Sequence, residues 1–237
     1  MKINLTDNLK MGCKQFNVDP FDTCQGRPCY TEGCYAQQGV RNPVTGATGP
    51  RYTACTKSWA QNYGAMMHHG ERFVQTMIEK IKGLKHFRWF SAGDVPEDAE
   101  NIVWRIMGAT QFTKHLIFTK NIDAHRQIMD HPMTAHVMSY FSLWPVKGLN
   151  VGQYREVIAT ANMKQYAIVV PSKETVKQGP VWRFLKWCKE RDYEAKVCPG
   201  ACVKCGRWCW KPRTKKIKVV LFKAHGLHKN KISKGME

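Results

Sequence analysis

Short apolar runs alternate with amphipathic stretches over most of the chain. Runs bounded by Gly, Pro or polar residues predict strands at 87–92, 115–119, 137–144, 166–170, 195–197 and 217–222. Helical spacing predicts helices at 66–83, 122–130 and 181–191, and Pro96 followed by acidic residues predicts the start of another. Residues 154–162 fit either type of element. Strands that alternate with helices favour an α/β fold of about six strand–helix units, either an open, mainly parallel sheet or a partial (β/α) barrel.

The rest of the chain divides by composition. Residues 1–65 are rich in Gly, Pro, Asn, Thr and Cys, which predicts a segment dominated by loops. We therefore expect an α/β core at 1–194, a cysteine-rich segment with the last strand at 195–228, and a basic tail at 229–237. In the helix at 181–191, Trp182, Leu185 and Cys188 are expected to face inward, with Cys188 as an inert core thiol.

Charge and hydropathy narrow the setting. The 237 residues carry a formal net charge of +19, which predicts attraction to polyanions and favours DNA or RNA as a partner over a merely basic surface. No apolar run approaches the roughly 20 residues that a membrane span needs, and residues 1–7 contain no apolar stretch of a secretion signal. We expect a cytoplasmic protein without a membrane partner. Its ten cysteines are then expected to be metal ligands or redox groups, not disulfides.

The first cysteine motif contains Cys24, Cys29 and Cys34, with four residues between each pair. Gly26, Pro28 and Gly33 lie between them and permit a loop in which the thiolates converge. Three thiolates can hold three irons of a [4Fe–4S] cubane and leave the fourth iron open, whereas a fourth thiolate would close it. Zinc is the simpler alternative. Cys13 and Cys55 are possible fourth ligands.

The second motif is the more specific one. It contains Cys198, Cys202, Cys205 and Cys209 within twelve residues, at spacings typical of metal ligands. Four thiolates so close would repel one another without a cation, so the motif predicts a bound metal. The ligands fit zinc or a second iron–sulfur cluster equally well. Basic residues and two tryptophans, Trp208 and Trp210, are interleaved with these cysteines. The indoles can either stack on nucleic-acid bases or cover the metal site.

Four short motifs in this order resemble the phage "gene product 88" family: Gly-Cys-Tyr-Ala at 33–36, Phe-Ser-Ala-Gly-Asp at 90–94, Phe-Thr-Lys at 118–120 and Cys-Gly-Arg-Trp-Cys-Trp at 205–210. The likeness covers most of residues 12–226. That family in turn resembles radical S-adenosylmethionine proteins, although their usual cysteine spacing is Cys-x3-Cys-x2-Cys and here both gaps are x4. The resemblance implies a partial barrel in which Cys24, Cys29 and Cys34 ligate the cluster. It also implies that Ser91, Gly93 and Asp94 hold the amino group of S-adenosylmethionine, in the cytoplasm of a phage-infected host cell.

Other polar residues carry weaker signals. His225 follows the last predicted strand and Lys120 and Asn121 follow another, which are positions that line sites in α/β barrels. His68 and His69 are adjacent and so point in different directions on a helix, which favours surface or core histidines over metal ligands.

Two functions follow as hypotheses. One is a radical S-adenosylmethionine enzyme that modifies a nucleic-acid or nucleotide substrate. The other is a non-catalytic nucleic-acid-binding protein with structural zinc or iron–sulfur sites.

Overall fold

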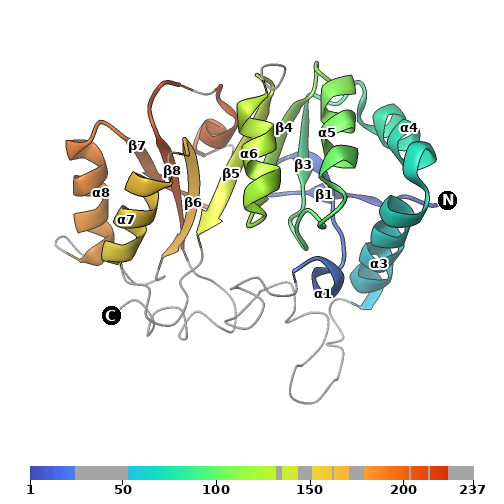
Figure 1. The fold of residues 1–237 in the computed structure, drawn as a ribbon, viewed down its shortest axis with the longest axis horizontal. Coiled ribbons are helices and arrows are strands. Elements are labelled where there is room, and N and C mark those ends of the chain that lie inside the picture. Colours follow the sequence, from blue (N-terminus) through green and yellow to red (C-terminus); the bar gives the residue numbers. More distant parts are fainter. Residues whose placement is uncertain are drawn as a thin grey trace, which may run out of the picture.

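An open, eight-stranded sheet forms the centre of the protein (Figure 1). The computed structural model describes residues 1–24, 53–131, 135–143, 151–161, 163–170, 179–202, 204–212 and 214–223. The strands are β1 (Leu5–Asn8), β2 (Cys13–Phe16), β3 (His86–Trp89), β4 (Lys114–Thr119), β5 (Val137–Leu143), β6 (Gln165–Val170), β7 (Glu194–Val197) and β8 (Lys218–Lys223). They lie in the order β1-β2-β3-β4-β5-β6-β8-β7, and only the pair β1–β2 is antiparallel. The predicted mainly parallel, open sheet is therefore confirmed.

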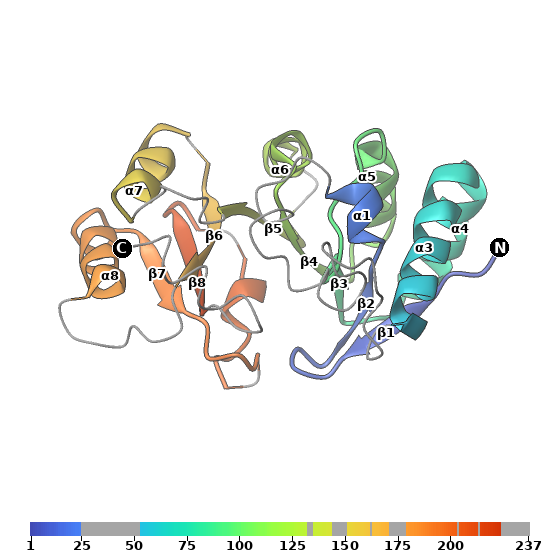
Figure 2. The same cartoon turned by 90° about the horizontal axis from the view of Figure 1, so that it is seen from below.

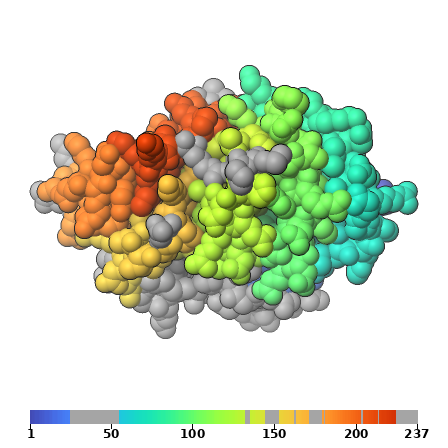
Figure 3. Space-filling view, turned by 45° about the horizontal axis from the view of Figure 1, so that its top comes forward, coloured from blue at the N-terminus to red at the C-terminus, as the bar shows by residue number. Residues whose placement is uncertain are grey.

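The helices cover one face of this sheet, which we call the helix face. They are α3 (Thr53–His68), α4 (Gly70–Ile81), α5 (Glu100–Ala109), α6 (Ile122–Asp130), α7 (Val151–Thr160) and α8 (Pro180–Glu190). The one-turn helix α1 (Pro20–Thr23) lies at the carboxyl edge of the sheet (Figure 1). Figure 2 shows the longer helices on this face and the segment between β7 and β8 on the other. Figure 3 shows the colours of the helices following one another across the molecule, from α3 and α4 at one end to α7 and α8 at the other. None of the described helices is long and apolar enough to cross a membrane.

Strand order explains why the cysteine-rich segment lies opposite the helices. From β2 to β6 each new strand is added on the same side of the previous one, and β7 is placed beyond the position of β8. The chain then returns by one position, from β7 to β8. Because crossovers between parallel strands are right-handed, reversing the direction moves the connection to the other face. Residues 198–217 make this connection and contain the short 3₁₀ helix η3 (Trp208–Trp210).

Both faces of the sheet are therefore buried, and neighbouring residues of a strand pack into different layers. In β5, Val137 packs into the core under the helices, whereas Met138 and Tyr140 pack against Trp210 on the other face. Near-continuous apolar strands such as β6 are typical of parallel sheets covered on both sides.

The amino-terminal prediction was partly wrong. Residues 1–65 contain β1, β2, α1 and most of α3, where the sequence predicted loops. Strands of four residues give too little alternation to detect, and β2 is stabilised by pairing with β3, about seventy residues later in the chain. The predicted helix 66–83 is the end of α3 and all of α4, which are separated at His69.

Three further details differ from the predictions. The helix expected to open at Pro96 begins at Glu100, because Asp98 has a φ of +70°, which no helix admits. Residues 154–162, which fitted either element, lie mainly in helix α7. In α8 the exposed fraction of Trp182 is 43%, so its predicted inward orientation was wrong, while Cys188 is fully buried as predicted. The buried face of α8 is formed by Val181, Phe184 and Cys188.

Candidate metal centres

Cys24 lies at the carboxyl edge of the sheet, directly after α1. Asp19 caps this one-turn helix by accepting a hydrogen bond from the Phe21 N–H, and Pro20 occupies its first position, where the missing N–H is no loss. The N–H of Cys24 then donates to the Pro20 carbonyl at 3.0 Å, and the cysteine is 2% exposed. The predicted ligands Cys29 and Cys34 lie outside the described residues.

The turn after β3 packs directly on α1. A Cβ on Gly93 would lie 2.5 Å from Val18 Cγ2 and 2.9 Å from Thr23 Oγ1, and Gly93 has a φ of +78°. The Asp94 N–H donates to Thr23 Oγ1 at 3.1 Å, and that oxygen lies 3.8 Å from the Cys24 sulfur. Thr23 therefore connects the first cysteine to the Gly93–Asp94 turn. Thr23 was not among the predicted site residues, and its position next to Cys24 was the only signal available.

The Asp94 carboxylate is fully buried and bonded within the protein. It accepts hydrogen bonds from Thr119 Oγ1 at 2.5 Å, from the Lys120 N–H at 2.7 Å and from its own neighbour's N–H, that of Val95, at 2.8 Å. Thr119 and Lys120 stand at the end of β4. Asp94 thus joins the carboxyl ends of β3 and β4.

Ser91 belongs to a different set of contacts. Its hydroxyl donates to Gln15 Oε1 at 2.7 Å, and its backbone N–H donates to Asn17 Oδ1 at 2.8 Å. The structure therefore brings Cys24, Gly93 and Asp94 together and directs the Ser91 hydroxyl toward β2.

The two candidate fourth ligands lie at opposite edges of the sheet, Cys55 at the carboxyl edge and Cys13 at the amino edge. Cys55 packs in a small apolar cluster with Phe21, Trp59 and Ala92, on the same side as Cys24. Cys13 begins β2 and so lies at the amino edge, in the apolar cluster that contains Cys202. Burial raises the pKa of the Cys13 thiol to about 11, an effect that Arg88 opposes and Cys202 reinforces.

The second cysteine motif is folded onto the face opposite the helices. The N–H of Cys198 donates to the Leu221 carbonyl at 2.8 Å, which extends the β7–β8 pairing by one residue. The N–H of Cys202 donates to the Lys10 carbonyl at 3.0 Å and so ties the segment to the β1–β2 hairpin. Burial, together with the neighbouring thiols Cys198, Cys202 and Cys205, raises the pKa of the Cys209 thiol to about 12. The four thiols therefore lie in one region, although no three His, Cys, Asp or Glu side chains in the described part of the chain already have the geometry of a metal site.

Aromatic residues and a buried lysine close this region. Trp210 is 2% exposed, and its ring meets the His86 ring edge-on with the centroids 4.9 Å apart. Trp210 is therefore buried inside the protein and is not exposed to stack on a base. Lys218 is 2% exposed, lies 5.1 Å from the centre of the Trp208 ring, and donates to the carbonyls of Lys211 and Pro212. Burial lowers the Lys218 pKa.

The remaining candidates have local roles. Asn121 caps α6 by accepting from the N–H groups of Asp123 and Ala124, and it donates to Glu100. His68 and His69 are exposed at the junction of α3 and α4. His225 lies outside the described residues.

The fold and the cysteines define an α/β protein whose open sheet carries one cysteine motif beginning at its carboxyl edge and a second packed on the face away from its helices. The chain belongs to the Gene product 88 family, whose model matches residues 3–195. The match contains the first cysteine motif and ends before Cys198. The motif at 205–210, one of the four on which the family resemblance was based, therefore lies outside the matched range. No curated protein and no solved structure matches the chain.

Proposed function

We propose that this protein is an iron–sulfur protein in which Cys24, Cys29 and Cys34 hold a [4Fe–4S] cluster at the carboxyl edge of the sheet. The observation that carries the proposal is the position of Cys24, buried at this edge beside the turn after β3. Open α/β sheets bind their ligands at the carboxyl ends of the strands. Phe90, next to this turn, has a φ of +49°, an unusual conformation for a bulky residue and one that concentrates at functional sites.

An open coordination position on one iron would permit chemistry of the radical S-adenosylmethionine type. Such a cluster supplies an electron for reductive cleavage of that cofactor, and the charge of +19 favours a nucleic-acid or nucleotide substrate. Gly93 and Asp94 do not fit the role of cofactor contacts in this structure. The space beside Gly93 is filled by Val18 and Thr23, and the Asp94 carboxylate is buried and bonded to β4. We therefore derive no catalytic step through S-adenosylmethionine.

The second candidate is a non-catalytic nucleic-acid-binding protein with two structural metal sites. It is favoured by the hydrogen bonds that already occupy the Asp94 carboxylate, and by the packing of Cys198, Cys202 and Cys209 against the sheet. Zinc or an iron–sulfur cluster on these thiols and on neighbouring Cys205 would hold the segment in place. Metal–thiolate sites of this kind couple metal binding to folding, at about 10 kcal/mol or more.

Anaerobic purification with analysis of iron, sulfide and zinc tests both candidates. We expect a brown protein whose first cluster contributes about four iron and four sulfide per chain. Changing Cys24, Cys29 and Cys34 together to Ala should remove this contribution. A colourless protein that contains only zinc would refute the iron–sulfur proposal.

Two further measurements separate the candidates. A change in the electron paramagnetic resonance spectrum of the reduced cluster on addition of S-adenosylmethionine indicates an open iron, and an unchanged spectrum favours the structural role. At the second site, Cys205→Ser should lower the melting temperature more than Cys188→Ala, which removes a buried thiol from α8. Equal effects would argue against a metal on Cys205.

A further inference from the structure

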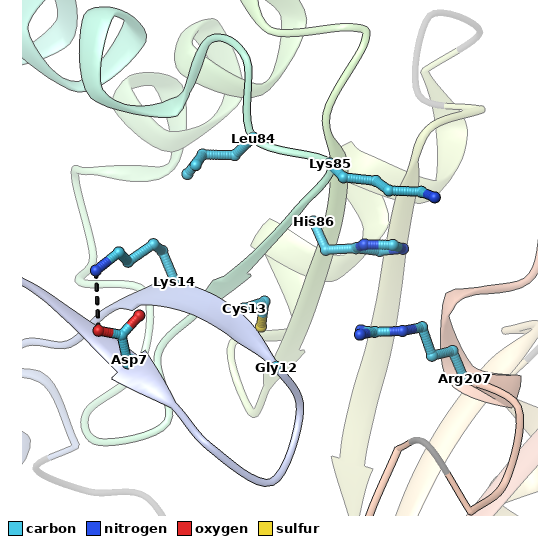
Figure 4. Close-up of a pocket in the computed structure, with 8 residues that line it drawn as sticks. All are labelled: Asp7, Gly12, Cys13, Lys14, Leu84, Lys85, His86 and Arg207. Carbon is cyan, nitrogen blue, oxygen red and sulfur yellow. Dashed lines mark hydrogen bonds and ion pairs between the residues drawn. The ribbon is translucent and has the colours of Figure 1, made fainter.

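A cavity of about 400 Å³ opens at the amino edge of the sheet (Figure 4). This volume falls in the range of small-ligand sites, roughly 300–1,000 Å³. Three segments far apart in the chain form it: the β1–β2 hairpin, the turn between α4 and β3, and the cysteine-rich segment. Its lining residues are Asp7, Gly12, Cys13, Lys14, Leu84, Lys85, His86 and Arg207.

The lining is positively charged. Its single acid, Asp7, is paired with Lys14 at 2.9 Å. Within the described residues, neither Lys85 nor Arg207 has a carboxylate partner. Two uncompensated cations therefore face one small cavity, an arrangement that attracts an anion.

Arg207 is held in place by the hairpin. Its Nη1 donates to the Met11 carbonyl at 2.7 Å, and a Cβ on Gly12 would lie 3.2 Å from its Nη2. Gly12 has a φ of +60°, so glycine suits both the turn and the close approach of the guanidinium. A fixed guanidinium with further N–H groups available is well suited to bind phosphate oxygens.

His86 supplies a third polar group. No hydrogen bond to its imidazole occurs among the described residues, and its ring is set edge-on against Trp210. In Figure 4 the side chains of His86 and Arg207 reach into the same space. Burial lowers the pKa of His86, and the charges of Arg207, Lys114 and Lys85 lower it further. A bound anion would offset these charges and raise that pKa.

We infer that this pocket binds a phosphate group, either of a free nucleotide or of a nucleic-acid strand, through Lys85, Arg207 and His86. The inference does not rest on the iron–sulfur proposal, because none of the proposed cluster ligands Cys24, Cys29 and Cys34 lines the pocket. A protein that lacks iron but binds phosphate would refute only the iron–sulfur proposal. A protein that holds iron but does not bind phosphate would refute only the present inference.

The test compares Lys85→Gln/Arg207→Gln with Lys189→Gln in the full chain purified under anaerobic conditions. Lys189 is exposed in the last turn of α8 and lies in a different element from the pocket. Binding of a twelve-nucleotide oligothymidylate is measured over a range of salt concentrations. The double variant should bind about tenfold more weakly. A plot of its log affinity against log salt should be less steep by about 1.4, since each neutralised phosphate of a single strand contributes about 0.7 to the steepness. Lys189→Gln should leave both values unchanged.

The His86 titration, followed by nuclear magnetic resonance, gives a second readout that a folding defect does not imitate. The oligonucleotide should raise the pKa of His86 in the unmodified protein and leave it unchanged in the double variant. An equal rise with thymidine monophosphate and inorganic phosphate identifies a free phosphate ligand, and a rise with the oligonucleotide alone identifies a strand. If Arg207→Gln prevents folding, Lys85→Gln alone is compared. Two results together would overturn the inference. The pKa of His86 would stay unchanged with all three probes, and the double variant, or Lys85→Gln alone, would bind the oligonucleotide as tightly as Lys189→Gln does.

Discussion

Gly93 has both a left-handed backbone and no space for a side chain. Gly83 has a similar φ, +87° against +78°, but nothing lies within 4 Å of its Cβ position. The two positions therefore separate the effect of backbone conformation from the effect of steric clash. Around Gly93 the obstacles include the Val18 carbonyl at 2.6 Å, which cannot move without disturbing α1.

We predict that Gly93→Ala destabilises the protein more than Gly83→Ala. The left-handed conformation costs a non-glycine residue about 1–2 kcal/mol at either site, and overpacking adds about 1–3 kcal/mol at Gly93 alone. Urea unfolding of the two variants measures the difference. Equal free energies of unfolding would show that α1 does not pack on the turn.

His115 is a second residue with a measurable signature. It is completely buried, accepts a hydrogen bond from Trp89 Nε1 at 3.1 Å and contacts Thr110 Oγ1 at 2.9 Å through its other nitrogen. Burial, with a smaller contribution from the charge of nearby His136, lowers its pKa to about 3. Folded His115 is therefore neutral at every pH above about 3.

The free energy of unfolding should consequently decrease as the pH is lowered. Between about pH 6.5 and pH 3 the unfolded chain binds a proton at His115 that the folded chain does not bind, so stability is full above this window and is lost as the pH falls through it. The loss approaches about 1.4 kcal/mol per pH unit. His115→Gln should remove this component of the slope. His69→Gln, at an exposed histidine, serves as the control and should leave the slope unchanged.

At the scale of elements, helices and strands with a clear apolar pattern could be predicted from the sequence, whereas short strands that depend on pairing with distant segments could not. The predicted range 122–130 is that of α6, because Asn121 is a strong cap and Ile128 gives its apolar face. The strands β4 and β6 were each predicted to within one residue, since a buried parallel strand is a continuous apolar run. By contrast, the β1–β2 hairpin depends on contacts with β3 and with Arg207, which no local pattern reveals.

The candidate sites divide in the same way. Cysteine spacing identified both motifs, but spacing cannot place them on the sheet. It therefore grouped Cys13 with the first motif, whereas the structure places it on the side of Cys202. The basic pocket was out of reach of the sequence, because Lys14, Lys85 and Arg207 come together only when three distant segments meet.

At the scale of the whole molecule, the dominant property is a net charge of +19. Its cations are distributed unevenly, with nine of the 37 basic residues in positions 211–237 and Glu237 as the one acid there. If nucleic acid is the partner, the affinity should fall steeply with salt, because each phosphate that is neutralised releases a counterion.

The tail offers a prediction that is separate from the pocket. Residues 229–237 lie outside the described part of the chain, and they contain Lys229, Lys231 and Lys234. Deleting them should make the fall of log affinity for duplex DNA with log salt less steep by about 2 to 3, or about one for each phosphate that a lysine no longer neutralises. Replacing the three lysines by Gln at full length should lower the slope equally, because charge and not chain length sets it. Combined with Lys85→Gln/Arg207→Gln, the two reductions on a single strand should add, since the groups occupy independent sites. A slope that neither tail variant changes would show that these lysines do not bind phosphate, and would confine nucleic-acid binding to the folded part of the molecule.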